Sequence, residues 1–227
     1  MRSLILVLTL LLASALPVHA QPAPALPGLT EGVEYNAIEG GKPFQPQAPG
    51  KIEVVEVFSY SCPHCALMQP KLEAWQATLP KSVVVSYMHA AFHPEDPFML
   101  GYLAADAAKA VPLTHHRMFA AVHEKNELPK NATLQQVTAF YLRSPGVNAK
   151  AFNAALADKA TLGRKMLATR DFQMLSKLPG TPALVVDGRY LVLGNSYDSI
   201  LDNARKIIDA ITASRKPAGK ASPKPRS

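Results

Sequence analysis

The stretch that decides the fold runs from Ile52 to Cys65 and reads IEVVEVFSYSCPHC. Its first half, 52–58, is rich in Val and Ile, which is typical of a central strand covered on both faces. Its second half contains both cysteines of the chain, Cys62 and Cys65, and opens a helical pattern that continues to Leu79. Two cysteines separated by two residues at a strand-to-helix junction predict a redox site.

The elements around this stretch predict an α/β domain that is interrupted by helices. Residues 82–89 read as a second buried strand, so 52–89 is a strand–helix–strand unit whose strands run parallel. Strands at 33–38, 183–186 and 190–193 and a helix at 197–213 complete the domain, with Asp187-Gly188 as a hairpin turn. Between them, apolar spacing predicts helices at 98–110, 113–124, 134–143, 148–157 and 162–175.

This order predicts an α/β fold in which a mixed central sheet is flanked by helices and carries an inserted all-helical subdomain. We assign residues 33–93 and 176–213 to the sheet-containing domain and residues 94–175 to the helical insertion. Residues 21–32 are rich in Pro, Ala and Gly, so we expect them to form a flexible leader.

The two ends of the chain carry signals of their own. Residues 1–20 combine Arg2, an apolar run and a small-residue end at Ala20, which predicts a cleaved signal peptide and an exported protein. The net charge of +7 arises mostly at the other end, because five basic residues and no acid follow from Ser214 onward. Without Arg2 and those five, the chain carries +1, so we expect a disordered basic tail at 214–227 and no nucleic-acid partner.

The cysteine pair is a poor structural staple, because so short a bridge removes little entropy from the unfolded chain. Electron transfer and metal binding remain as its uses. Cys62 lies where the helix begins, and the unpaired N–H groups and the positive dipole end there favour its thiolate. Pro63 suits the first helical position, and His64 adds positive charge beside the sulfur. We expect Cys62 to be the attacking sulfur, and Cys65, one turn deeper, to resolve the mixed disulfide.

A stabilised Cys62 thiolate favours the reduced pair, so the disulfide form is predicted to pass its bond to substrates. The metal alternative would use Cys62, His64 and Cys65, but no fourth ligand is indicated nearby, and we predict no metal site. A second candidate metal cluster lies on the helix predicted at 113–124, where we interpret the histidines as a solvated face. Its members are His115, His116 and His123.

These motifs resemble those of the periplasmic thiol:disulfide oxidoreductases of the DsbA type, in the thioredoxin superfamily. The matching features are the acid-containing strand before Cys-Pro-His-Cys, the helical insertion, and Gly180-Thr181-Pro182-Ala183 before a hairpin, within residues 33–213. The resemblance implies a thioredoxin-like fold, a periplasmic location and a dithiol oxidase that needs no cofactor beyond its Cys62–Cys65 disulfide.

The resemblance also implies roles for residues outside the cysteine motif. Glu56, six residues before Cys62, matches a buried acid that helps to move the proton of the inner cysteine. Thr181 and Pro182 match a segment, with Pro182 in cis, that packs against the cysteines and pairs with an extended substrate. The lysine that the family commonly places in the next strand is missing here, and Tyr87 stands in that region.

The sequence thus predicts a monomeric enzyme that donates its disulfide to newly exported, unfolded or reduced proteins. The family implies that a membrane partner of the DsbB type reoxidises it and passes the electrons to quinone. A disulfide isomerase or reductase is one alternative, although the segment before the core strand is too short for the dimerisation domain of the isomerases. A non-enzymatic periplasmic chaperone or metal carrier is the other.

Overall fold

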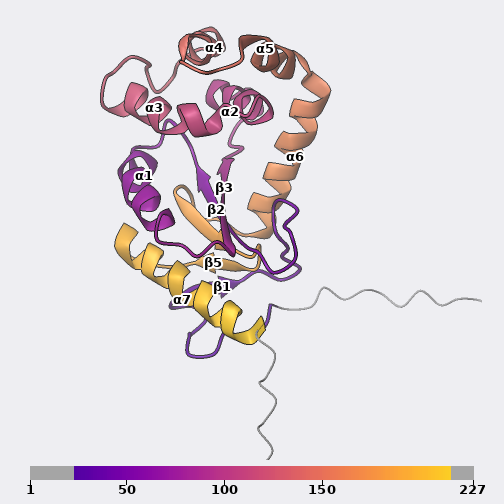
Figure 1. The fold of residues 1–227 in the computed structure, drawn as a ribbon, viewed down its shortest axis with the longest axis vertical. Helices are drawn as coiled ribbons and strands as arrows, with labels where there is room; N and C mark the ends of the chain where they lie inside the picture. The colour runs from indigo at the N-terminus through magenta and orange to yellow at the C-terminus, as the bar shows by residue number, and fades with distance from the viewer. Residues whose placement is uncertain (1–22, 216–227) are drawn as a thin grey trace, which may run out of the picture.

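A computed structural model describes residues 23–215, which fold around a five-stranded mixed sheet in the order β1-β5-β4-β2-β3 (Figure 1). The predicted signal peptide and nearly all of the predicted tail lie outside the described residues. The strands are β1 Tyr35–Ala37, β2 Ile52–Phe58, β3 Val83–His89, β4 Ala183–Val186 and β5 Tyr190–Val192. The helices are α1 Pro63–Gln76, α2 Pro97–Ala107, α3 Val111–His123, α4 Leu134–Arg143, α5 Ala149–Ala157, α6 Lys159–Leu175 and α7 Tyr197–Arg215.

Strand β2 is the centre of the sheet, and all seven of its residues are buried. It pairs in parallel with β3 and antiparallel with β4, so the predicted strand–helix–strand unit and the mixed sheet are both confirmed. Because successive side chains point to opposite faces, β2 contributes Val54 to one core and Val55 to the other.

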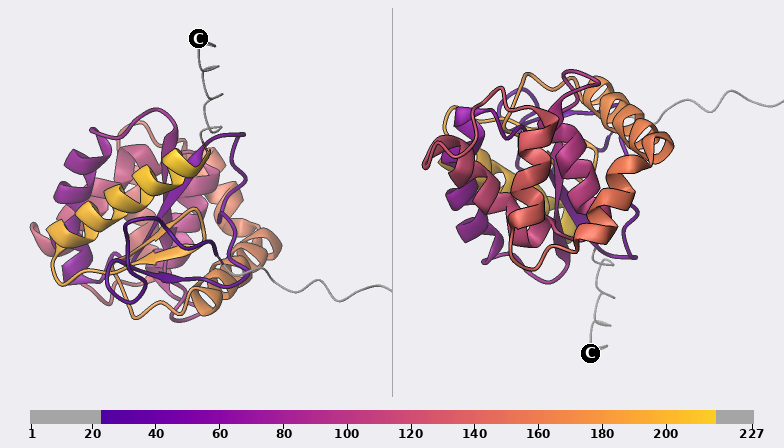
Figure 2. Two further views of the ribbon diagram at one scale, coloured as in Figure 1. Left: turned by 90° about the horizontal axis from the view of Figure 1, so that it is seen from below. Right: turned by 90° about the horizontal axis from the view of Figure 1, so that it is seen from above.

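The two faces of the sheet are covered by different helices. Helices α1 and α7 lie side by side on one face, where Met68 and Ile207 pack with Val54 (Figure 2). Helix α6 covers the other face and packs Phe172 against the core that contains Val55. This is the two-sided covering that the apolar run of β2 predicts.

The predicted helical insertion is present as helices α2 to α6, each within a few residues of its expected bounds. Helix α4 matches its prediction at both ends, because Thr133 and Gln136 form a reciprocal capping box at its start. The insertion packs on β2 through Phe58 and is tied back to the end of β3, where the Ala91 N–H donates to Gln173 Oε1 at 2.6 Å.

The hairpin between β4 and β5 turns at Asp187 and Gly188, whose φ angles are 54° and 64°. Such left-handed conformations at both central residues are those of the tight turn that Asp-Gly predicts. Gly188 is also required by space, because a Cβ there would stand 1.9 Å from the carbonyl oxygen of Lys42.

Two predicted boundaries differ from the structure. We expected residues 21–32 to form a flexible leader, but the described part of that segment, 23–32, packs on the domain: Leu26 is buried, and the Tyr190 hydroxyl donates to the Pro24 carbonyl. At the other end α7 includes Arg215, because its guanidinium pairs with Asp187 at 2.7 Å and donates to the Lys51 carbonyl. Apolar packing and this ion pair extend the ordered fold beyond what local composition suggests.

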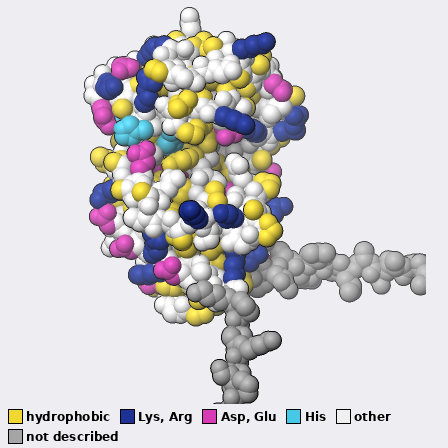
Figure 3. Space-filling view, in the orientation of Figure 1, with side chains coloured by type: hydrophobic (Ala, Val, Ile, Leu, Met, Phe, Trp, Pro, Cys, Tyr) yellow, Lys and Arg dark blue, Asp and Glu magenta, His cyan; other side chains and the backbone are white. Residues whose placement is uncertain are grey.

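The distribution of charged side chains and the polarity of the helices describe the outer surface. On the face shown in Figure 3, basic and acidic side chains are interspersed rather than gathered by sign. Among residues 23–215, every helix is too short or too polar to cross a membrane.

Candidate active site

The cysteine motif occupies the start of α1, directly after β2. Cys62 is the N-cap residue, with φ −80° and ψ 118°, and Pro63 begins the helix. Both cysteines are free thiols, and they differ in access: Cys62 is partly exposed, whereas Cys65 is fully buried. An incoming sulfur can therefore reach Cys62 and is kept from Cys65.

The two sulfurs have pKa values shifted in opposite directions. The pKa of Cys62 falls to about 5, chiefly because the Cys65 S–H donates a hydrogen bond to its thiolate, against a smaller cost of burial. The Thr181 side chain and the backbone N–H groups of His64 and Cys65 add to this stabilisation. The pKa of Cys65 is raised far above its ordinary value by its hydrogen bond to Cys62 and by burial. Cys62 is thus the thiolate of the reduced pair at neutral pH.

The loop before β4 faces Cys62. The Thr181–Pro182 peptide bond is cis, as the resemblance predicts. The Cys62 thiol lies 3.3 Å from the Thr181 carbonyl oxygen, to which it can donate when it is protonated. Residues that are far apart in the sequence thus meet at one sulfur.

Glu56 lies in the middle of β2 and is fully buried, as its apolar neighbours predict. Neither carboxylate oxygen has a hydrogen-bond partner in the described part of the chain. Burial raises its pKa to about 8, with a smaller contribution from the charge of Glu73. The charge of Glu56 is in turn one of the smaller causes that raise the pKa of Cys65, so the acid and the inner sulfur interact electrostatically.

Tyr87 is the residue of β3 that pairs with Glu56. Its hydroxyl donates to Gln76 Oε1 at 3.1 Å, so it bonds to α1 rather than to the acid. The register therefore confirms that a tyrosine stands beside Glu56 in the next strand, where the resemblance leads one to expect a lysine.

A second buried acid on β2, Glu53, shows what a satisfied carboxylate looks like in this protein. It lies on the opposite face and accepts from the N–H of Phe44 at 2.7 Å, the N–H of Gln45 at 3.2 Å and the hydroxyl of Ser86 at 2.7 Å. The Gln47 side-chain amide donates to it as well, at 3.2 Å. Buried carboxylates in this protein can thus be fully hydrogen-bonded, and the lack of partners distinguishes Glu56 from Glu53.

The three histidines of α3 do not form the solvated face that we expected. His115 is only 4% exposed, and its ring stands 4.3 Å from that of Tyr87. His123 is half-buried and donates to the Tyr60 carbonyl oxygen at 2.7 Å, whereas His116 is exposed and pairs with Glu73. The expectation was wrong for His115 because its side chain lies on the apolar stripe of α3.

His115 belongs to a buried polar chain beside the cysteines. Its Nδ1 lies 2.9 Å from the Tyr60 hydroxyl, and its Nε2 lies 3.2 Å from Gln69 Oε1. Since the amide oxygen can only accept, Nε2 carries the proton and the Tyr60 hydroxyl donates to Nδ1. Burial lowers the pKa of His115 to about 3, which agrees with a neutral ring.

The comparisons with known proteins agree with this geometry. Residues 45–210 match the family model described as Thioredoxin. The chain is 31% identical over 215 residues to the thiol:disulfide interchange protein DsbA of Bordetella parapertussis, covering 91% of this chain and 96% of that protein. It is also 31% identical to DsbA of Pseudomonas aeruginosa, over 84% of this chain and 86% of that protein. The crystal structure of the oxidoreductase DsbA from Xylella fastidiosa superposes with a TM-score of 0.72 at 37% identity, covering 82% and 97% of the two chains.

The chain belongs to the thioredoxin family, among the DsbA-type thiol:disulfide interchange proteins. It is thus a thiol:disulfide oxidoreductase with the thioredoxin-like fold. A DsbA-type enzyme uses its cysteine pair as the redox group and needs no external cofactor. Within residues 23–215, we find no group of three or more His, Cys, Asp or Glu side chains placed to hold a metal ion.

The DsbA-type site also includes residues that the sequence did not single out. Gln69 is buried one turn after Cys65 on α1, and Tyr60 is buried two residues after the end of β2, so both lie close to the motif in the sequence. The burial of His115 could have been read from the apolar Met118, Phe119 and Val122 that share its helix face. The contact of His64 with Tyr197 had no such signal, because the two residues are 133 positions apart.

Proposed function

We propose that this protein donates its Cys62–Cys65 disulfide to newly exported, reduced proteins in the periplasm. The observation that carries the proposal is the opposite shift of the two cysteine pKa values, with a Cys62 pKa of about 5. A Cys62 thiolate that is stable in the reduced enzyme is a good leaving group when the mixed disulfide with the substrate is attacked, so the oxidised form passes its bond on readily.

In the first step, a substrate thiolate attacks the exposed Cys62 sulfur. A bond forms between the substrate sulfur and Cys62, and the Cys62–Cys65 bond breaks with its electron pair on Cys65. In the second step, another substrate thiolate attacks the substrate sulfur of this mixed disulfide and releases Cys62 as a thiolate. The substrate has then lost two electrons and two protons, and the enzyme has gained the two electrons.

Glu56 supplies a proton for the first of these steps in our proposal. With a pKa of about 8, its carboxyl is protonated at neutral pH, and its charge acts on the pKa of the sulfur that leaves. Transfer of that proton to Cys65 gives a neutral thiol and a carboxylate, which then recovers a proton from water. This avoids holding a thiolate on the fully buried Cys65.

The substrate backbone is proposed to lie along the Thr181–Pro182 segment, which faces Cys62 at 3.3 Å. Reoxidation would pass the electrons onward. A quinone-linked membrane partner takes two electrons from the reduced cysteine pair, and the quinone takes up these electrons and two protons to become quinol. Periplasmic location follows from the predicted signal peptide, and the DsbA-type relatives support it.

The test of the oxidase role is the equilibrium of the enzyme with glutathione. We expect a potential well above that of a reductant such as thioredoxin, which is near about −270 mV, and fast oxidation of a reduced, unfolded exported protein. A potential near the thioredoxin value would overturn the proposal.

Two matched variants test the roles of the cysteines. Mixed with a protein that already carries a disulfide, Cys65→Ser should accumulate a mixed disulfide through Cys62. The Cys62 thiolate attacks one substrate sulfur, the other leaves as a thiolate, and the resolving sulfur of Cys65 is gone. Cys62→Ser should accumulate none, although it keeps the same number of thiols. Equal trapping by the two variants would contradict the assignment of the attacked sulfur.

A further inference from the structure

The imidazole of His64 is held by a residue from the other end of the chain. His64 Nδ1 lies 2.9 Å from the hydroxyl of Tyr197, the first residue of α7. The groups that stabilise the Cys62 thiolate are the Cys65 thiol, the Thr181 side chain and two backbone N–H groups. The imidazole, which neighbours the sulfur in sequence, is thus engaged elsewhere in the reduced enzyme.

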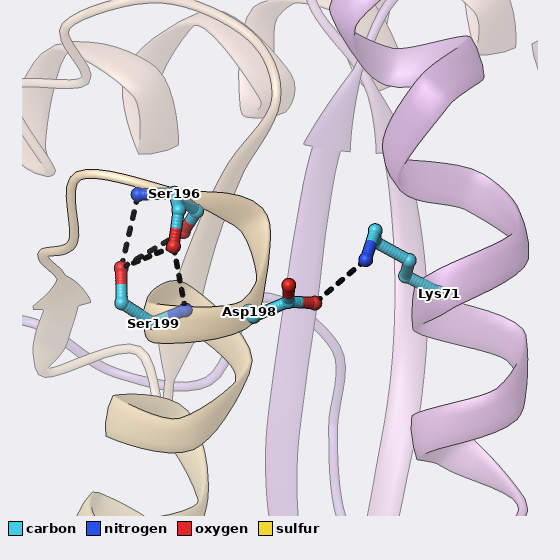
Figure 4. A network of polar contacts seen from close by, with 4 residues as sticks. All are labelled: Lys71, Ser196, Asp198 and Ser199. Carbon is cyan, nitrogen blue, oxygen red and sulfur yellow. Dashed lines mark hydrogen bonds and ion pairs between the residues drawn. The ribbon is translucent and has the colours of Figure 1, made fainter.

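The position of Tyr197 is fixed by its surroundings. Ser196 and Ser199 cap α7 with reciprocal bonds: the Ser196 N–H donates to Ser199 Oγ at 3.0 Å, and the Ser199 N–H donates to Ser196 Oγ at 3.1 Å (Figure 4). In the same turn Asp198 pairs with Lys71 of α1 at 2.8 Å (Figure 4). The Tyr197 ring packs on the apolar core between the sheet and α1. Packing thus holds the Tyr197 hydroxyl in place as a hydrogen-bond partner for His64, at the start of α1.

We propose that Tyr197 is a positioning residue that holds the His64 imidazole against the start of α7 and thereby limits its approach to the Cys62 sulfur. An imidazole that is hydrogen-bonded to the hydroxyl cannot use the same nitrogen for the thiolate, and its ring is drawn toward α7. The hydroxyl and the thiolate thus compete for one side chain.

This competition would set the oxidising strength of the enzyme from outside the cysteine motif. If the hydroxyl is removed, the imidazole is free to turn to Cys62 and donate a hydrogen bond to the thiolate. The reduced form is then stabilised further, and the disulfide becomes a stronger oxidant. The inference rests on the proposed function only in taking Cys62 as the attacking sulfur.

The test is Tyr197→Phe, which removes the hydroxyl and keeps the ring that packs in the core. We expect the pKa of Cys62, followed by thiolate absorbance, to fall by about half a unit, and the equilibrium constant with glutathione to shift about threefold toward the reduced enzyme. The matched control is Tyr190→Phe, which removes a hydroxyl that donates to the Pro24 carbonyl and leaves the His64 contact intact. It should change neither quantity by more than a small fraction of that amount.

A second background isolates the imidazole. In a His64→Gln enzyme, adding Tyr197→Phe should leave the pKa of Cys62 where His64→Gln alone puts it. A Cys62 pKa that is unchanged or raised in Tyr197→Phe, or lowered equally in both backgrounds, would overturn the inference. Thiolate absorbance needs no substrate, so these outcomes are distinct from failure of the oxidase role, which a wild-type Cys62 pKa near about 8.5 would show.

Discussion

Replacing Glu56 with glutamine should stabilise the folded protein, by an amount that grows with pH. The carboxyl is fully buried, both of its oxygens lack partners among the described residues, and its pKa in the folded state is about 8. In the unfolded chain the pKa is close to the ordinary 4.5. Between these values the folded protein keeps a proton that the unfolded chain has lost.

The direction and size of the effect follow from this difference in bound protons. Because the unfolded state binds fewer protons between about pH 4.5 and 8, the free energy of unfolding falls as pH rises, by about 1.4 kcal/mol for each pH unit. The loss starts near the unfolded pKa and is complete above the folded pKa. Up to pH 7 it amounts to about 3 kcal/mol, and Glu56→Gln, which cannot ionise, avoids it.

Glu53→Gln is the matched control on the same strand. Its carboxylate accepts from two backbone N–H groups and from the Ser86 hydroxyl. An amide in this place would turn its NH₂ group toward donors, so we expect a loss of about 1–3 kcal/mol. The same chemical change should therefore have opposite signs at two positions three residues apart.

The measurement is urea unfolding from pH 4 to 8.5, followed by the fluorescence of Trp75, the single tryptophan of the chain. The oxidised form should be used, because neither cysteine titrates in a disulfide. Glu56→Gln should match the parent near pH 4 and exceed it progressively up to pH 8. If the two proteins have equal stability at pH 7, or if the difference does not change with pH, then Glu56 does not ionise at a cost and the reasoning is refuted.

Four further outcomes are expected. The reduced enzyme should lose its thiolate absorbance with a midpoint near pH 5, and iodoacetamide should modify Cys62 and spare Cys65 until the protein is unfolded. Because the folded pKa of Cys62 is depressed while that of Cys65 is raised, the extra stability of the reduced over the oxidised form should be greatest near about pH 8.5. It should vanish as pH falls through 5 and decline again at higher pH, which denaturation of both forms would show. His115→Phe strands the Tyr60 hydroxyl, so it should cost about 1–3 kcal/mol at pH 7, but it should also remove the part of the acid-induced destabilisation that begins below about pH 6.5. Thr133→Ala should lower the free energy of unfolding by about 1 kcal/mol without changing the cysteine pKa values, because it removes only the cap of α4.

The sequence predicts the parts of this fold that local patterns determine. Strand β2 and helix α4 have the bounds that we expected, because a Val-rich run and a capping pair define them without help from the rest of the chain. The burial of Glu56 followed in the same way from its apolar neighbours on one face.

The remaining parts depend on contacts between distant segments. Leu26 lies in a Pro- and Ala-rich segment that is typical of a linker. It is nevertheless buried, because it packs with Tyr35 and Tyr190 in the core on one face of the sheet. The burial of His115 agrees with the apolar Met118, Phe119 and Val122 on its helix face, although the polarity of the three histidines favours exposure. The pairing of His64 with Tyr197 depends on how α1 and α7 meet, which no pattern within either helix specifies.

The bond between Ala91 and Gln173 closes the helical insertion at its base, and it has a consequence for changes in the length of this insertion. The bond holds the two ends of the segment 92–172 together, so this segment connects to the sheet-containing domain as one long closed loop. Because the entropy of closing a loop rises only with the logarithm of its length, doubling this loop would cost about 0.6 kcal/mol. Changes in the length of this segment should therefore cost little at its closure, and Cys62 and Thr181 can stay in register while it varies.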